Sequence, residues 1–338
     1  MTAAAGMVRT ASGATGGAWL LALPVAAFIV VFLAWPVATV LYTAFADGQG
    51  GFTTGHISAF LSISLMREAF VNSLVVALGS VAFATLIAVP LAYLTVRFEF
   101  RGAALVQTLG VLPLVMPPFV GAVALQLLFG RNGSVNLLLG EAFGIRIPFM
   151  DGLNGVIFVE GLHYFPFILL NLVAALGNID GAMEEAAQNL GSHGFRLFRR
   201  VVFPLAAPGF VAGAALVFVK VFDDLGTPLV LNVTNMLAPQ AYLRITSVGL
   251  EDPIGYVIAL VMIVFSIGAL ALSARITKGR DYATLTRGGS ALRKRPLTGR
   301  SAVLAYGWVL LVLALVLSPH LGLLLLSLAK VWSYSVLP

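Results

Sequence analysis

Seven long apolar stretches decide what this chain can fold into. A helix needs about 20 consecutive apolar residues to cross the roughly 30 Å hydrocarbon layer of a bilayer, and each stretch is long enough. Backbone polar groups inside lipid must be hydrogen-bonded within the segment, so the stretches are expected to be helices. The sequence therefore predicts an all-α polytopic membrane protein with spans at 18–45, 70–95, 103–129, 154–176, 207–231, 254–275 and 301–328.

The composition supports this fold class and excludes several functions. Of the 338 residues, 59% are hydrophobic and 10% are charged, which is more apolar surface than a soluble core requires. The chain has no cysteine, so disulfides, thiolate catalysis and thiolate metal sites are excluded. The net charge is +6, but the basic residues lie beside apolar spans without interleaved aromatic residues. We therefore expect no nucleic acid partner.

The basic residues also predict the orientation in the membrane. With the N-terminus in the cytoplasm, most of the 20 Lys and Arg residues fall on the cytoplasmic side, as the positive-inside rule requires. This orientation places the polar loop 177–206 in the cytoplasm without reference to any motif.

The first part of this loop is predicted to be a short helix. Asp180 is placed to cap it, and Glu184 falls in its early turns, where a carboxylate favours the positive end of the helix dipole. Gly191 permits the backbone conformation that ends a helix.

The second part of the loop is predicted to be another short helix, capped by Ser192. Pro204 is expected to mark the return of the chain into the membrane. The apolar side chains of this part are expected to pack inward, namely Phe195, Phe198 and Val202.

The loop also carries a specific motif, Glu185-Ala186-Ala187, with Gly191 six positions after Glu185 and Pro204 thirteen positions further on. This pattern resembles the EAA loop of the membrane subunits of ABC importers. The resemblance covers roughly residues 65–275 and implies a type I importer fold, with a six-span permease domain at 18–275 in a bacterial inner membrane. It implies three kinds of protein partner, namely cytoplasmic ATPase subunits, an external solute-binding protein and a second permease half.

In the family that the loop resembles, the first short helix sits in a groove of the ATPase subunit. The resemblance implies polar contact by Glu185, close packing by Ala186 and Ala187, and a bend at Gly191. The expected coupling residues are Glu184, Glu185, Ala186, Ala187, Gly191 and Pro204. The sequence has no Gly-Lys pair for a phosphate-binding loop. We therefore expect a transport subunit that is not an enzyme and binds no cofactor, with ATP and Mg²⁺ bound by the partner.

Ionisable residues inside the spans are costly and indicate function. Glu160 and His163 lie in the fourth predicted span, and Lys220, Asp223 and Asp224 lie in the fifth. At about 1.5 Å per residue the two groups reach similar depths, so they are candidates to line one polar passage. In the alternative, Lys220 pairs with an aspartate three or four positions on and only holds two spans together. No metal-ligand set is predicted.

The segment Phe222–Pro228 resembles the corresponding span of permeases for ferric iron. It also resembles relatives that handle organophosphonates, phosphorylated sugars, polyamines or thiamine. Carboxylates and a histidine suit ferric iron or a polyamine, whereas an anionic cargo would depend on Lys220. The alternative function is an ion- or proton-coupled secondary transporter with Glu160, His163, Asp223 and Asp224 as its relay. An intramembrane enzyme is disfavoured because Glu160-Gly-Leu-His163 is not His-Glu-x-x-His.

Two proline-rich sites and the ends of the chain complete the predictions. Met116-Pro117-Pro118 is expected to break the third span, and Gly226-Thr227-Pro228 to interrupt the fifth. Residues 1–17 are expected to be disordered and 276–300 to form a basic cytoplasmic linker. We expect 301–338, in which Pro319 echoes Pro36 of the first span, to open a second homologous half. The alternative is a C-terminal anchor on a single half.

Overall fold

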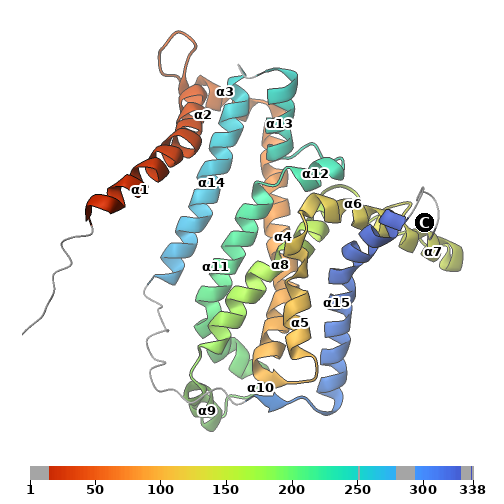
Figure 1. The fold of residues 1–338 in the computed structure, drawn as a ribbon. Helices are drawn as coiled ribbons and strands as arrows, with labels where there is room; N and C mark the ends of the chain where they lie inside the picture. The colour runs from red at the N-terminus through yellow and green to blue at the C-terminus, as the bar shows by residue number, and fades with distance from the viewer. Residues whose placement is uncertain (1–14, 250–251, 279–293, 329–335, 337–338) are drawn as a thin grey trace, which may run out of the picture.

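The computed structural model describes residues 15–249, 252–278, 294–328 and 336, and this part of the chain is almost wholly helical (Figure 1). Within it, six helical segments are long and apolar enough to span a membrane, and they correspond to six of the seven predicted spans. They are α1 (Thr15–Ile29) with the π-helix Val30–Ala34 and α2 (Trp35–Phe45), α4 (Ser64–Arg97), α8 (Gly152–Gly177), α10 (Gly194–Leu197) with the π-helix Phe198–Val202 and α11 (Phe203–Phe222), α14 (Pro253–Thr277) and α15 (Gly299–Leu328).

The third predicted span, 103–129, is not a straight helix. α5 (Ala103–Gly110) and the 3₁₀ turn Leu112–Val115 lead to a break, after which α6 (Pro118–Phe129) and α7 (Ser134–Phe143) turn away by 103°. Pro117 and Pro118 have no backbone N–H, so the ladder of helical hydrogen bonds cannot pass them. The predicted break of the third span at Met116-Pro117-Pro118 is confirmed.

The fifth predicted span, 207–231, has different bounds in the structure. Its helix starts at Gly194, ends at Phe222, and is followed by the short α12 (Gly226–Val230). Asp224 helps to start α12, because its Oδ2 accepts a hydrogen bond from the backbone N–H of Thr227 at 2.8 Å. The predicted interruption is confirmed, although the helix already ends before Gly226.

α8 is the centre of the helical bundle and packs between α4 and α11. Glycines on α11 allow the close approach. A Cβ atom at Gly213 would lie 2.7 Å from the Cα of Ile168, and one at Gly209 would lie 2.6 Å from the carbonyl oxygen of Asn171. Small residues at such crossings are the usual device for packing helices in lipid, where no hydrophobic effect drives helices together.

The remaining elements cover the two sides and ends of this centre (Figure 1). α2 and α3 (Gly55–Ser62) contact α14, whereas α15 contacts α5 and α6 on the other side. α13 (Leu237–Ser247) packs against α14 and α4 at one end. The other end carries α9 (Gly181–Asn189) and a short parallel ladder of β1 (Phe98–Glu99) and β2 (Arg295–Pro296).

Three predicted regions lie partly outside the described residues. These are 1–14 of the predicted disordered N-terminus, 279–293 of the predicted linker, and most of 329–338. Residues 15–17 belong to α1, so that part of the predicted disorder is wrong.

The glycine contact between α8 and α11 gives a stability prediction. Gly213→Ala should destabilise the protein by about 1–3 kcal/mol, the usual cost of overpacking, because the added Cβ meets the backbone of Ile168. Gly268→Ala on α14 is the matched control, since a Cβ there meets no atom within 4 Å. Thermal unfolding in detergent measures both variants. Equal melting temperatures for Gly213→Ala and the unmodified protein would contradict the prediction.

Candidate functional site

The first helix of the loop 177–206, α9, forms as its capping residues predict. Asp180 is its N-cap, and Oδ1 accepts a hydrogen bond from the backbone N–H of Ala182 at 3.0 Å. At the other end Gly191 has φ +85°, and the N–H of Ser192 donates to the carbonyl oxygen of Ala187 at 3.0 Å. Only glycine adopts this left-handed backbone without strain, so Gly191 provides the predicted bend.

The second part of the loop differs from its prediction. The N-cap of α10 is His193, without a side-chain cap, so the prediction of a Ser192 cap is wrong. Pro204 does not separate the loop from the span, because α10, the π-helix Phe198–Val202 and α11 form one continuous helix. Proline at the start of α11 is tolerated where the wider π turn already lacks the regular hydrogen bonds.

The loop has one face anchored to the bundle and one face exposed. Glu185 and Ala186 are exposed, whereas Ala187 is half-buried against the core. Phe195 is 76% exposed, so its predicted inward packing is wrong, while Phe198 and Val202 do pack inward. Two further apolar side chains on this face were not predicted, Met183 and the 89%-exposed Leu190. Exposed large apolar side chains that gather on one surface are typical of a protein-binding surface.

Glu184 has a different environment from Glu185. Its Oε1 forms an ion pair with Nη2 of Arg97, at the end of α4, and the two side chains are only 12% and 5% exposed. Burial raises the pKa of Glu184, and the positive charges of Arg97 and Arg295 oppose that rise. Glu184 therefore faces the bundle and fixes α9 to it, which leaves Glu185 free to face a partner.

A second group of polar residues lies inside the bundle. Glu160 of α8 is fully buried, and its carboxyl faces Asp224 and the hydroxyl of the equally buried Thr227. Both Glu160 carboxyl oxygens lack a hydrogen-bond donor among the described residues. His163, one turn along α8, lines a small cavity with Met116 and Pro319. The structure thus brings residues of the fourth and fifth predicted spans together, and adds Thr227 as a hydroxyl that the sequence did not single out.

Asp223 and Lys220 lie outside this buried group, exposed on the surface of α11. Asp223 accepts a hydrogen bond from the hydroxyl of Ser266 on α14, at 2.9 Å. In the described part of the chain the ion pairs are Arg97–Glu184, Arg131–Asp151 and Arg244–Asp252. None of these ion pairs joins Lys220 to Asp223 or Asp224, and the alternative of a structural pair stays a prediction.

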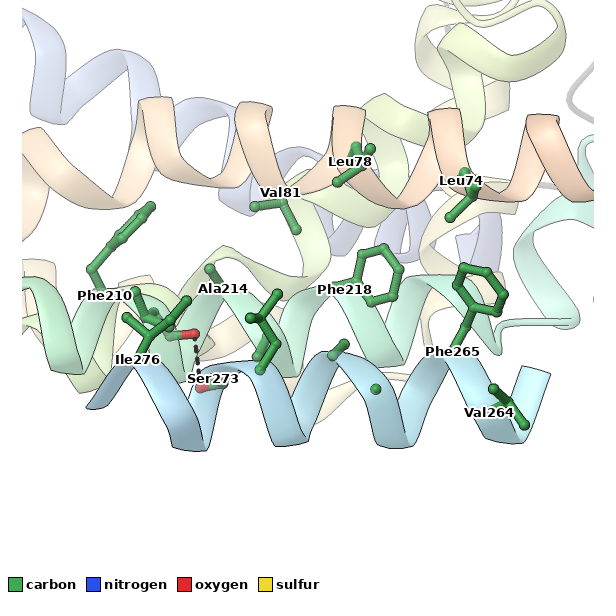
Figure 2. Close-up of a pocket in the computed structure, with 15 residues that line it drawn as sticks. Leu74, Leu78, Val81, Phe210, Ala214, Phe218, Val264, Phe265, Ser273 and Ile276 are labelled. Carbon is green, nitrogen blue, oxygen red and sulfur yellow. Dashed lines mark hydrogen bonds between the residues drawn. The ribbon is translucent and has the colours of Figure 1, made fainter. Parts of the chain in front are cut away.

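Figure 2 shows an apolar groove of about 580 Å³ between α4, α11 and α14. Its walls are formed by side chains such as Leu78, Phe218 and Phe265, and no charged residue lines it. The hydroxyl of Ser273 donates to the carbonyl oxygen of Val211 within the groove, at 3.5 Å. A groove of this kind provides no ligand for a polar cargo, so the buried group around Glu160 is the better candidate site.

Comparison with known proteins agrees with the fold. Residues 81–282 match the family described as the binding-protein-dependent transport system inner membrane component. The match covers more than half of the chain, which therefore belongs to this family of multi-pass membrane proteins.

Relatives within this group differ in the cargo that their names state. The chain is 26% identical over 260 residues to the putative ferric transport system permease protein FbpB 1 of Haemophilus influenzae, which covers 76% of this chain and 41% of that protein. It is 31% identical over 211 residues to the molybdenum transport system permease protein ModB of Haemophilus influenzae. This alignment covers 61% of this chain and 91% of that protein. It is 27% identical over 259 residues to the putative 2-aminoethylphosphonate transport system permease protein PhnU of Salmonella typhimurium. This alignment covers 75% of this chain and 90% of that protein.

The chain spans about two fifths of the length of its ferric transport relatives. Among solved structures, it resembles a bacterial ABC transporter involved in the import of the acidic polysaccharide alginate. The TM-score is 0.60 at 20% identity, with 77% of this chain and 96% of that chain covered. This likeness establishes the fold.

Proposed function

We propose that this chain is a membrane permease subunit of an ATP-driven importer and that α9 is its coupling helix. The observation that carries the proposal is the two-sided character of α9. Glu184 and Ala187 face the bundle, whereas Glu185, Ala186 and Leu190 face the solvent. A helix held on one side and open on the other transmits the movement of a partner to the spans.

The proposed partners follow from this role. Cytoplasmic ATPase subunits bind α9 and supply the energy, with ATP and Mg²⁺ on their side, because this sequence has no phosphate-binding loop. An external solute-binding protein delivers the cargo. We place the N-terminus in the cytoplasm, since the arginines that follow α9 then lie on the cytoplasmic side, where the positive-inside rule expects Lys and Arg.

A second permease half is needed to complete the translocation path. Lys220 and Asp223 are exposed at membrane depth, and charges there are tolerated only against protein or water. We therefore propose that this face of α11 meets the second half across a hydrated path, with Glu160, His163 and Asp224 behind it.

We further propose that residues 301–338 open such a half within the same chain. Pro319 lies inside α15 and is followed by an apolar run, as Pro36 is in the first span, which supports equivalence of the first and seventh spans. Sequencing of the gene beyond Pro338 tests this proposal. A continuing reading frame with a second Glu-Ala-Ala loop is expected, and an immediate stop codon would contradict it.

Ferric iron is the cargo that we propose. The named relatives include ferric, molybdenum and 2-aminoethylphosphonate permeases, so family membership leaves the choice open. Three carboxylates, Glu160, Asp223 and Asp224, against one cation, Lys220, favour a positively charged cargo or complex. The relay of the secondary-transporter alternative is incomplete among the described residues, because Asp223 bonds Ser266 rather than joining Glu160 and Asp224.

The coupling role predicts the effect of reversing one charge. Glu185→Lys should abolish cargo uptake and leave the spans folded, because the residue is exposed on α9 and forms none of the ion pairs found among the described residues. Glu141→Lys is the control, since Glu141 is exposed on α7, away from α9 and β1. Uptake and ATP hydrolysis are measured in reconstituted vesicles. Undiminished uptake by Glu185→Lys would remove the coupling assignment.

If Asp223 and Asp224 line the translocation path, their substitution should impair transport while the ATPase stays bound. Asp223→Asn and Asp224→Asn should each lower ferric uptake about tenfold or more, the usual value of one charge-assisted hydrogen bond, without loss of ATPase binding. Asp151→Asn, in the exposed pair with Arg131, is the control. Uptake assays and co-purification of the ATPase measure the two effects. Loss of the assembled complex instead would indicate that the aspartates serve the fold and not the path.

A further inference from the structure

The segment that follows the sixth span returns to the end of α4 and binds there. β2 pairs in parallel with β1, with Phe98 opposite Arg295 and Glu99 opposite Pro296. The backbone N–H of Leu297 also donates to the carbonyl oxygen of Glu99, at 3.4 Å. Residues 294–297, named here the strap, therefore lie beside the segment that follows α4 and pair with its backbone.

Contacts on both sides of the ladder hold the strap in place. Before it, Nζ of Lys294 donates to the carbonyl oxygen of Thr95 at 3.1 Å. After it, the hydroxyl of Tyr306 on α15 accepts a hydrogen bond from the backbone N–H of Arg101 at 3.1 Å. The rings of Tyr306 and Phe100 also meet edge to face, with centroids 5.9 Å apart. The start of α15 is thus fixed to the same turn as the strap.

The turn that binds the strap is also the anchor of α9. Arg97, one residue before β1, forms the buried ion pair with Glu184. Arg295 of the strap lines the same pocket of about 330 Å³ as Arg97, Glu184 and Gln188, and its charge acts on the carboxylate of Glu184. Glu184 therefore lies between a cation of α4 and a cation of the strap.

We propose that Arg295 is a positioning residue for α9 and that the strap links α9 mechanically to α15. This inference rests on the proposed coupling role of α9. A partner that displaces α9 acts through Glu184 on Arg97 and Arg295 together, so the end of α4 and the start of α15 move with it. If α15 opens a second half, the strap joins the coupling helix of the first half to the first span of the second.

The first test reverses the charge of the strap. Arg295→Glu should lower the amount of cargo imported per ATP hydrolysed several-fold, because the new carboxylate repels Glu184, while the ATPase still co-purifies. Arg295→Lys, which keeps the positive charge, should import as much cargo per ATP hydrolysed as the unmodified protein. Arg300→Glu is the matched control, since Arg300 is an exposed cation a few residues on that does not line the pocket. An unchanged ratio in Arg295→Glu would overturn the proposal.

The second test asks whether the strap stays closed during transport. The chain has no native cysteine, so the pair Glu99→Cys and Pro296→Cys supplies the only thiols, at positions that are opposite in the ladder. We expect the disulfide to form and uptake to be the same before and after reduction. Uptake that recovers only on reduction would show that the strap opens, which contradicts a rigid link. Absence of the ATPase from the unmodified complex would instead overturn the proposed function itself.

Discussion

The rest of the structure depends on the close packing of α8 against α4 and α11. Glycines at 161, 209 and 213 bring the three backbones so near that even a methyl group would meet its neighbours. Lipid tails are as apolar as the side chains, so such contacts and interhelical hydrogen bonds must supply the association that water provides in soluble proteins. α8 is buried over more than half of its length for this reason.

This packing makes α8 a rigid connection between the buried polar group and α9. Glu160 in its middle is held beside Asp224 and Thr227, which follow α11. Its C-terminal end leads within a few residues to α9, whose Glu184 returns to Arg97 of α4. In the proposed coupling role, a displacement of α9 would reach the polar group through these closely packed helices. The exposed apolar groove shown in Figure 2 has no part in this connection, because no ionisable side chain lines it.

Features that depend on local sequence could be predicted, and features that depend on tertiary pairing could not. The spans follow from apolar length, and Asp180 and Gly191 follow from the needs of a helix end. The 103° turn after Met116 could not be predicted, because its angle depends on where α6 packs. Ser192 and Phe195 were wrongly placed because the start of α10 depends on its continuation into α11. The ion pair of Arg97 and the strap of Arg295 join residues far apart in sequence, and no local pattern indicates them.

Coupling of α9 to an ATPase is the central claim, and isolation of the complex tests it most directly. The tagged chain would be purified from its native membrane under conditions that preserve assemblies, and the co-purifying proteins identified by mass spectrometry. We predict a cytoplasmic ATPase subunit whose cross-links to this chain fall within residues 181–191. A preserved assembly without an ATPase, or with cross-links confined to other surfaces, would contradict the coupling role of α9.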